Sequence, residues 1–257
     1  MNRSGKAAWI LAALVGAAMP TNALADARPF TFVYDTYPHG PQGFEYEQWV
    51  TWSHGTDEDN GFNEYNFKHE FEFGLAENFD LGIYVADWSY LDTADGSDTQ
   101  FEGAAVEGIL YLSSPVTDFI GVGLYGEIKV GEDELEFENK LLLQKDVGPW
   151  IFAYNLVVET ELEGVFDKGE ENEVEGVLGH ALGASYRLSD AWHVGAEATI
   201  ESEFEDWSDY DATVVYAGPN ASYWSESWYV TTTAMFQLTN EEDDPNFELR
   251  LIAGFQF

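Results

Sequence analysis

Apolar and polar residues alternate along most of the chain that follows residue 43. The clearest case is residues 247–257, where the apolar positions are Phe247, Leu249, Leu251, Ala253, Phe255 and Phe257 and the polar ones include Glu248, Arg250 and Gln256. Successive side chains of a strand point to opposite faces, so this alternation predicts strands with one apolar and one polar face. Residues 120–130 and 192–201 repeat the pattern.

Turn signals divide the alternating region into about twelve predicted strands, an even number, as expected of up-and-down membrane barrels. Each has about nine to fifteen residues, which is longer than the strands of soluble sheets and suits a tilted membrane crossing. The predicted strands are 44–54, 62–74, 80–91, 100–112, 120–131, 135–146, 150–163, 174–188, 192–204, 212–224, 228–238 and 246–257. The sequence therefore predicts an all-β fold in which residues 44–257 form an up-and-down antiparallel transmembrane β-barrel.

The connections between these strands are of two kinds that alternate strictly. One kind is short and carries little charge, at 75–78, 113–118, 147–149, 189–191 and 225–227; the other is acidic, at 57–59, 92–98, 132–134, 167–173, 205–211 and 241–244. Successive turns of such a barrel lie at opposite rims, so we assign the short kind to the periplasm and the acidic kind to the outside. The strands that leave short turns begin with aromatic residues, which predict a girdle at the membrane interface: Phe79, Phe119, Trp150, Trp192 and Trp228, with Phe44 in the equivalent place.

The first 25 residues have the pattern of a secretory signal peptide. Arg3 and Lys6 precede an apolar stretch over residues 7–19, and residues 23–25 have the small-x-small pattern of a cleavage site. Because the apolar stretch is shorter than the roughly 20 residues of a spanning helix, we predict export through the Sec pathway and cleavage after Ala25. Residues 26–43 are predicted to be a short periplasmic N-terminal segment, either a short strand or an inward tuck closed by a turn at 38–41.

The end of the chain carries a family resemblance. The signal peptide, the alternating residues 247–257 and the aromatic residues Phe255 and Phe257 resemble the closing strand of bacterial outer-membrane β-barrel proteins. Residues 43–51 resemble the opening of uncharacterised predicted twelve-stranded barrels. The resemblance implies location in the outer membrane of a Gram-negative-type bacterium, contact with outer-membrane lipid, and recognition of Phe255 and Phe257 by the barrel-assembly machinery. It carries no functional residues.

Composition limits the partners of this chain. It has 48 Asp and Glu residues against 10 Lys and Arg, a formal net charge of −38, and no cysteine. So acidic a surface repels nucleic acid, and a barrel closed by its own strand pairing needs no disulfide. With 45% hydrophobic and 16% aromatic residues, the chain is not a disordered acidic one.

The polar positions of the strands predict a lumen rich in charge. The predicted lumen residues are Glu47, Glu70, Glu107, Glu127, Glu138, Glu159, Glu197, Glu201, Lys68, Lys129, Lys140, Arg187 and Arg250, with Glu45, Glu64, Glu72, Glu136, Glu161, Glu175, Glu203 and Glu248 on the same face. Most basic residues beyond residue 25 thus fall among dense carboxylates, where salt bridges can brace the wall. His69 and His180 fall on the lipid face, either as neutral side chains or through a local bulge.

Two functions follow from this lumen. If rings of glutamate line a wet passage, the protein is a narrow pore or small-solute facilitator that favours cations. If the charges pack the lumen shut, it is a non-conducting structural or surface-binding barrel with acidic extracellular loops. A twelve-stranded barrel lies between the eight strands that side chains fill and the sixteen that leave a channel, so the strand number leaves both open.

Catalytic and metal signals are weak. The five histidines lack zinc-binding spacing, and no Ser-His or Asp-His group of a membrane-embedded hydrolase can be recognised, so we expect no enzyme and no cofactor. Acidic pairs in the loops could hold divalent cations through oxygen ligands, but no stretch matches a calcium-binding loop. The sequence therefore names no specific metal-binding residues.

Overall fold

The fold consists of twelve β-strands. A computed structural model describes residues 27–94, 96–166 and 173–257, so the predicted signal peptide lies outside the described residues. The strands are β1 (Phe44–His54), β2 (Asn63–Ala76), β3 (Phe79–Thr93), β4 (Gly96–Ser113), β5 (Gly121–Val130), β6 (Glu134–Val147), β7 (Trp150–Glu163), β8 (Glu173–Arg187), β9 (Trp192–Glu205), β10 (Asp209–Trp224), β11 (Trp228–Gln237) and β12 (Phe247–Gln256). The described part of the chain holds no helix long and apolar enough to cross a membrane.

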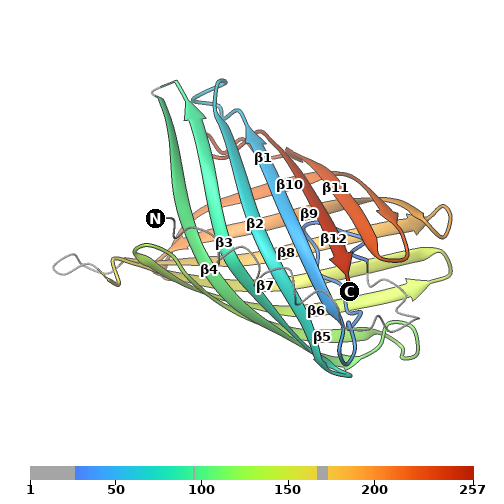
Figure 1. The fold of residues 1–257 in the computed structure, drawn as a ribbon. Coiled ribbons are helices and arrows are strands. Elements are labelled where there is room, and N and C mark those ends of the chain that lie inside the picture. Colours follow the sequence, from blue (N-terminus) through green and yellow to red (C-terminus); the bar gives the residue numbers. More distant parts are fainter. Residues whose placement is uncertain (1–26, 95, 167–172) are drawn as a thin grey trace, which may run out of the picture.

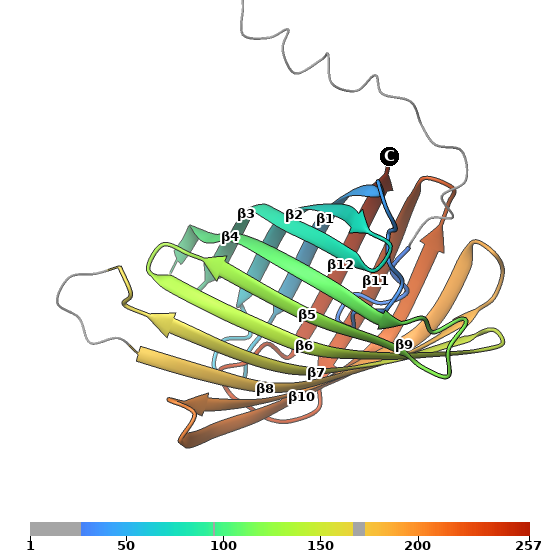
Figure 2. The ribbon, with the colours of Figure 1, turned by 90° about the horizontal axis from the view of Figure 1, so that it is seen from below.

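The strands close into a barrel in which each pairs antiparallel with its neighbours in sequence, and β1 pairs with β12 (Figures 1 and 2). This confirms the predicted up-and-down barrel, because hairpin connections between long amphipathic strands leave no edge once the first and last strands meet. At the seam the Phe257 amide donates to the Phe44 carbonyl at 2.9 Å, and the two rings lie 5.5 Å apart. The terminal aromatic residue therefore helps to join β12 to β1.

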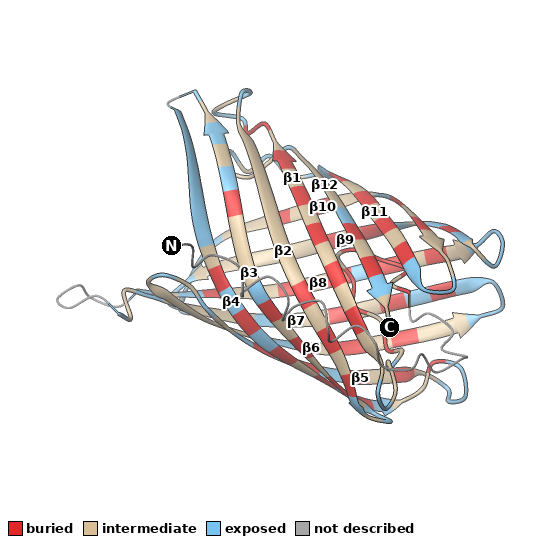
Figure 3. Cartoon of the chain, viewed as in Figure 1, coloured by how far each residue is buried: buried red, intermediate tan, exposed pale blue. Residues whose placement is uncertain are grey.

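Buried and more exposed residues alternate along strands such as β1, β4 and β5, as the apolar–polar alternation predicts (Figure 3). In β4 and β5, Val106 and Ile128 are about half exposed on the outside, whereas Glu107 and Glu127 are buried on the inside. The outer surface is thus apolar and the interior holds the charge, which is the reverse of a soluble protein and the arrangement of a membrane barrel.

The two histidines predicted on the lipid face are each paired with a tyrosine. His69 Nδ1 lies 2.8 Å from the Tyr46 hydroxyl, and His180 Nδ1 lies 2.8 Å from the Tyr154 hydroxyl. A polar ring in an apolar environment is costly unless it has a hydrogen-bond partner, and the adjacent strand supplies one in both cases. The pairing with β3 also shifts register between His69 and Glu70, but His69 keeps its outward position beside Tyr46.

Candidate functional site

The interior of the barrel is occupied by the segment before β1, residues 27–43, which we call the N-terminal plug. The sequence predicts a short periplasmic segment or an inward tuck for residues 26–43. The structure places residues 27–37 among the inward side chains and brings the chain back to the short-turn rim at Gln42, whose amide donates to the Gly74 carbonyl at 3.0 Å. Wall residues from all twelve strands lie against it: Glu47, Glu72, Tyr84, Glu107, Tyr125, Gln144, Asn155, Gly183, Glu197, Asn220, Thr231 and Arg250. All of these except Arg250, which lies nearer the acidic loops, are in the half of the barrel next to the short turns.

Arg28 anchors the plug to the first two strands. Its Nε lies 2.8 Å from Glu47 Oε1, and its Nη2 lies 2.6 Å from Glu72 Oε1 and 3.9 Å from Glu70 Oε2. The guanidinium also lies 4.6 Å from the centre of the Tyr34 ring. Only 12% of this side chain is exposed, so each charge depends on the others for its solvation.

Glu197 of β9 holds the middle of the plug through its backbone. Its carboxylate accepts the amides of Thr31 at 2.9 Å, Phe32 at 2.7 Å and Val33 at 3.1 Å. It also accepts the hydroxyl of Thr233 from β11. Three successive peptide N–H groups directed at one buried carboxylate are charge-assisted hydrogen bonds, which are stronger than neutral ones.

Further along, the plug bonds to amide side chains and fits against glycines. The Tyr34 amide donates to Asn155 Oδ1 at 2.7 Å, and the Thr36 amide donates to Gln144 Oε1 at 2.6 Å. A Cβ at Gly183 would lie 2.7 Å from the Phe30 ring, and one at Gly121 would lie 2.2 Å from Thr36 Oγ1. Larger residues at either position would clash with the plug, so the wall is shaped to receive it.

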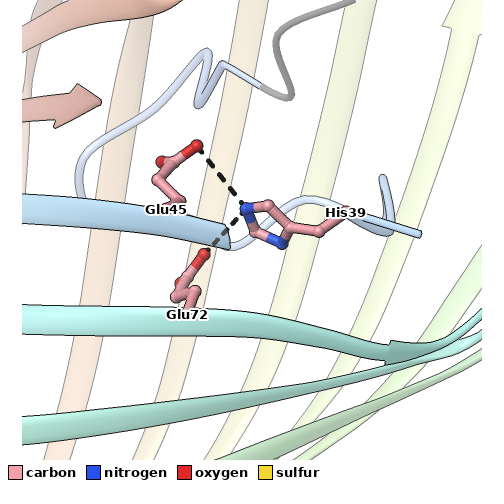
Figure 4. Close-up of side chains that lie close together, drawn as sticks. All are labelled: His39, Glu45 and Glu72. Atoms are coloured by element: carbon pink, nitrogen blue, oxygen red, sulfur yellow. Dashed lines mark ion pairs between the residues drawn. The ribbon is translucent and has the colours of Figure 1, made fainter. Parts of the chain in front are cut away.

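Near the end of the plug, His39 lies among carboxylates of the wall (Figure 4). His39 Nδ1 is 3.1 Å from Asp80 Oδ2, while Nε2 is 3.0 Å from Glu72 Oε2 and 3.6 Å from Glu45 Oε2. Burial by itself would lower the pKa of His39, but Glu72 and the bonds to Asp80 and Glu45 raise it well above its ordinary value. Burial raises the pKa of Asp35 in the same segment to about 6.

The other half of the barrel, toward the acidic loops, contains three cavities of about 320, 300 and 200 Å³, which we call the vestibule. Plug residues Thr31, Phe32 and Tyr34 form part of its lining. The lining carboxylates are Glu64, Asp87, Glu102, Glu127, Glu136, Glu138, Glu159, Glu201, Asp244 and Glu248, and the lining cations are Lys68, Lys129, Lys140 and Arg250. The vestibule is therefore acidic, and the plug lies beneath it.

The predicted lumen residues fall into three groups. Glu47, Glu70, Glu107 and Glu197 lie in the buried half beside the plug, and Glu127, Glu138, Glu159, Glu201, Lys68, Lys129, Lys140 and Arg250 line the vestibule. Salt bridges join Lys129 to Glu136 at 3.2 Å and Lys140 to Glu138 at 2.8 Å, while Arg250 lies over the Phe32 ring of the plug at 3.9 Å. Arg187 is exposed at the short-turn end of β8, apart from both groups.

Sequence reasoning missed Arg28, Tyr34 and His39 as interior residues. No strand alternation marks them, because the plug has irregular structure. The available signal was the excess of inward carboxylates over inward cations, which requires a positive group from outside the strands, and Arg28 is the first basic residue after the predicted cleavage site.

The acidic loops border a separate cavity of about 780 Å³, lined by residues 98–102, Glu132, Asp133, Glu134, Glu163, Gly164 and Glu173. The predicted acidic loop 167–173 falls mostly outside the described residues. Within the described ranges, His and carboxylate atoms close enough to share one ion occur in three groups, none of which lies in these loops: His39, Glu45 and Glu72; Glu47, Glu70 and Glu72; Glu136, Glu159 and Glu161.

Comparisons with known proteins agree with this fold. Residues 22–249 match the model of a family described as "Family of unknown function (DUF6662)". A solved structure of the NanC porin aligns with a TM-score of 0.56 at 10% identity, over 82% of this chain and 98% of that one. The translocator domain of autotransporter NalP from Neisseria meningitidis aligns with a TM-score of 0.50 at 14% identity, over 85% and 90%. No curated protein matches the sequence.

Proposed function

The chain belongs to this family of unknown function, and we propose from its geometry that it is a narrow outer-membrane facilitator that favours cations and is restricted by its own N-terminal plug. The barrel fold and its apolar outer face support insertion in a bacterial outer membrane, and the signal-peptide pattern of residues 1–25 is the basis for proposing export through Sec. Such a protein acts by passive permeation, with no enzymatic step and no cofactor.

The acidic vestibule carries this proposal. Its carboxylates outnumber its cations, and Lys129 and Lys140 are already paired with Glu136 and Glu138. Unpaired carboxylates in a narrow space between low-dielectric walls draw cations in and repel anions, as acidic rings do in cation channels. Glu159 and Glu201 are two of the vestibule carboxylates that have no Lys or Arg within salt-bridge distance among the described residues, and we choose them to test the proposal.

The plug favours a second candidate, a non-conducting barrel that binds partners or divalent cations through its acidic outer loops. A segment that contacts every strand fills the short-turn half of the lumen, and on this candidate it stays in place and blocks permeation. The two candidates differ in one observable, because only the facilitator conducts when the plug is released.

Replacing Glu159 and Glu201 by glutamine should reduce cation preference. Planar-bilayer recordings under a salt gradient should give a reversal potential on the cation side for the native protein, and the double variant should bring it roughly halfway to zero. The matched control, Glu241→Gln with Glu242→Gln in an outer loop, should shift it weakly and only at low salt, since exposed charges are screened. Absence of conductance from folded native protein and from plug-releasing variants alike would favour the second candidate.

Replacing Phe257 by aspartate should lower membrane insertion by on the order of tenfold, both through the proposed recognition of Phe255 and Phe257 by the assembly machinery and through loss of the Phe44 contact. Insertion is measured as the heat-modifiable, protease-resistant fraction in outer membranes. Gln256→Asn, which alters the inward neighbour bonded to Glu45, is the control and should insert nearly normally. Equal losses in both variants would contradict the proposed role of the aromatic residue.

A further inference from the structure

The contact between His39 and the wall has the arrangement of a metal-ligand set. Three donor atoms converge from three places in the chain: His39 Nε2 from the plug, Glu45 Oε2 from β1 and Glu72 Oε2 from β2 (Figure 4). All three atoms lie within 4.8 Å of one another. Glu45 is fully buried and Glu72 nearly so, with 4% of its surface exposed.

The spacing suits a small ion. A tetrahedral zinc site has bonds of about 2.0–2.1 Å to imidazole nitrogen and carboxylate oxygen, which sets neighbouring ligand atoms roughly 3.3 Å apart. The two distances from His39 Nε2, 3.0 and 3.6 Å, lie on either side of that value. The two imidazole–carboxylate distances therefore differ from the ideal spacing by only about 0.3 Å each, and the two carboxylate oxygens lie within 4.8 Å of each other.

The second nitrogen of His39 is held as it is in metal sites. His39 Nδ1 lies 3.1 Å from Asp80 Oδ2, and the same oxygen accepts the His39 amide at 2.9 Å. A carboxylate on Nδ1 is the usual outer partner of a metal-binding imidazole, because it places the proton on Nδ1 and directs the Nε2 lone pair at the ion. In the absence of an ion or a second proton, that lone pair would face two carboxylate oxygens, which is repulsive.

The charge around the cluster independently points to a cation. Five carboxylates are buried here: Glu45, Glu47, Glu70, Glu72 and Asp80. Among the described residues, the one Arg or Lys that forms salt bridges with them is Arg28. Neither oxygen of the fully buried Glu70 has a hydrogen-bond partner among the described residues. A buried surplus of carboxylates is unfavourable unless protons or a bound cation offset it.

We propose that His39, Glu45 and Glu72 bind a divalent first-row transition-metal ion of the zinc type, which fastens the end of the plug to β1 and β2. Imidazole in the ligand set favours such an ion over Mg²⁺ or Ca²⁺, which prefer oxygen ligands alone. The three ligands leave a fourth position for water. The site lies in the buried interior and is distinct from any cation binding by the outer loops.

Metal titration of the folded, detergent-solubilised protein tests this site. After chelator treatment and dialysis, Zn²⁺ should bind with a stoichiometry of one at the high-affinity step, and Mg²⁺ at the same concentration should not displace it. His39→Gln and Glu45→Gln should each weaken Zn²⁺ binding at least tenfold. His193→Gln is the matched control, since His193 is an inward, buried imidazole with no carboxylate within salt-bridge distance among the described residues, and it should leave affinity unchanged.

A spectroscopic measurement keeps the test decisive if a variant fails to fold. Co²⁺ bound to the native protein should give the visible absorption of a four-coordinate site, and X-ray absorption of the Zn²⁺ form should show one imidazole among oxygen ligands. Binding of equal strength by native protein and folded His39→Gln, or oxygen-only coordination in the native protein, would overturn the proposal. In that case a proton, not a metal ion, bridges His39 to the two glutamates.

Discussion

Replacing Arg28 by alanine should release the N-terminal plug from the barrel wall. The change leaves Glu47 and Glu72 buried without their 2.8 and 2.6 Å partners, and breaking a buried ion pair from one side costs roughly 3–5 kcal/mol. Hydrogen–deuterium exchange should therefore become about two to four orders of magnitude faster at the plug amides, since each 1.4 kcal/mol corresponds to about tenfold. On the facilitator hypothesis, single-channel conductance should rise as well.

Two variants make this result specific. Arg28→Lys should restore only part of the protection, because one ammonium group cannot reproduce the planar pair of contacts to Glu47 and Glu72. Arg187→Ala removes a basic residue at the exposed rim and should leave plug exchange unchanged. Native-like protection of the plug in Arg28→Ala would show that the ion pairs do not hold it.

Replacing Glu197 by alanine should loosen the middle of the plug. The carboxylate accepts three successive amides, and hydrogen bonds to charged groups contribute about 1.5–3 kcal/mol each. Each of the amides of Thr31, Phe32 and Val33 loses one of these bonds in the variant. Their hydrogen exchange should therefore be at least tenfold faster than in the native protein. The measurement is residue-resolved exchange by mass spectrometry or NMR on protein folded in detergent.

Glu201→Ala is the control for this experiment. It removes the same functional group from the same strand, but Glu201 lines the vestibule and accepts no plug amide among the described hydrogen bonds. If the plug amides respond equally to both changes, exchange reports general loosening of β9 instead of the loss of the Glu197 bonds.

Alternation was sufficient to predict the barrel because every strand has one face in lipid and one in the interior. All twelve predicted strands are present, and β1 and β7 have their predicted bounds, 44–54 and 150–163. The largest differences occur at acidic loops: β4 begins at Gly96, not at residue 100, and β10 begins at Asp209, not at residue 212. There the hairpins continue beyond the apolar stretch, where hydrophobicity no longer marks the strand.

The interior was only partly predictable. Glu47 and Glu197 could be placed inside the barrel from parity alone, but parity gives no information on what a side chain contacts across the lumen. Their partners are the Arg28 side chain and the Thr31–Val33 backbone, which belong to an irregular segment without periodicity. The number of strands could not distinguish a pore from a closed barrel, because it does not reveal that another part of the chain fills half the lumen.

The way the plug contacts every strand has a consequence for the order of folding. Its bonds span nearly the whole chain, with sequence separations of 203 residues between Arg28 and Thr231 and 219 between Thr31 and Arg250. Contacts of such separation form slowly because of the chain entropy lost in closing the loop. The binding surface for residues 27–43 is complete only when β12 has joined β1, so a segment synthesised before all twelve strands is among the last to reach its native place.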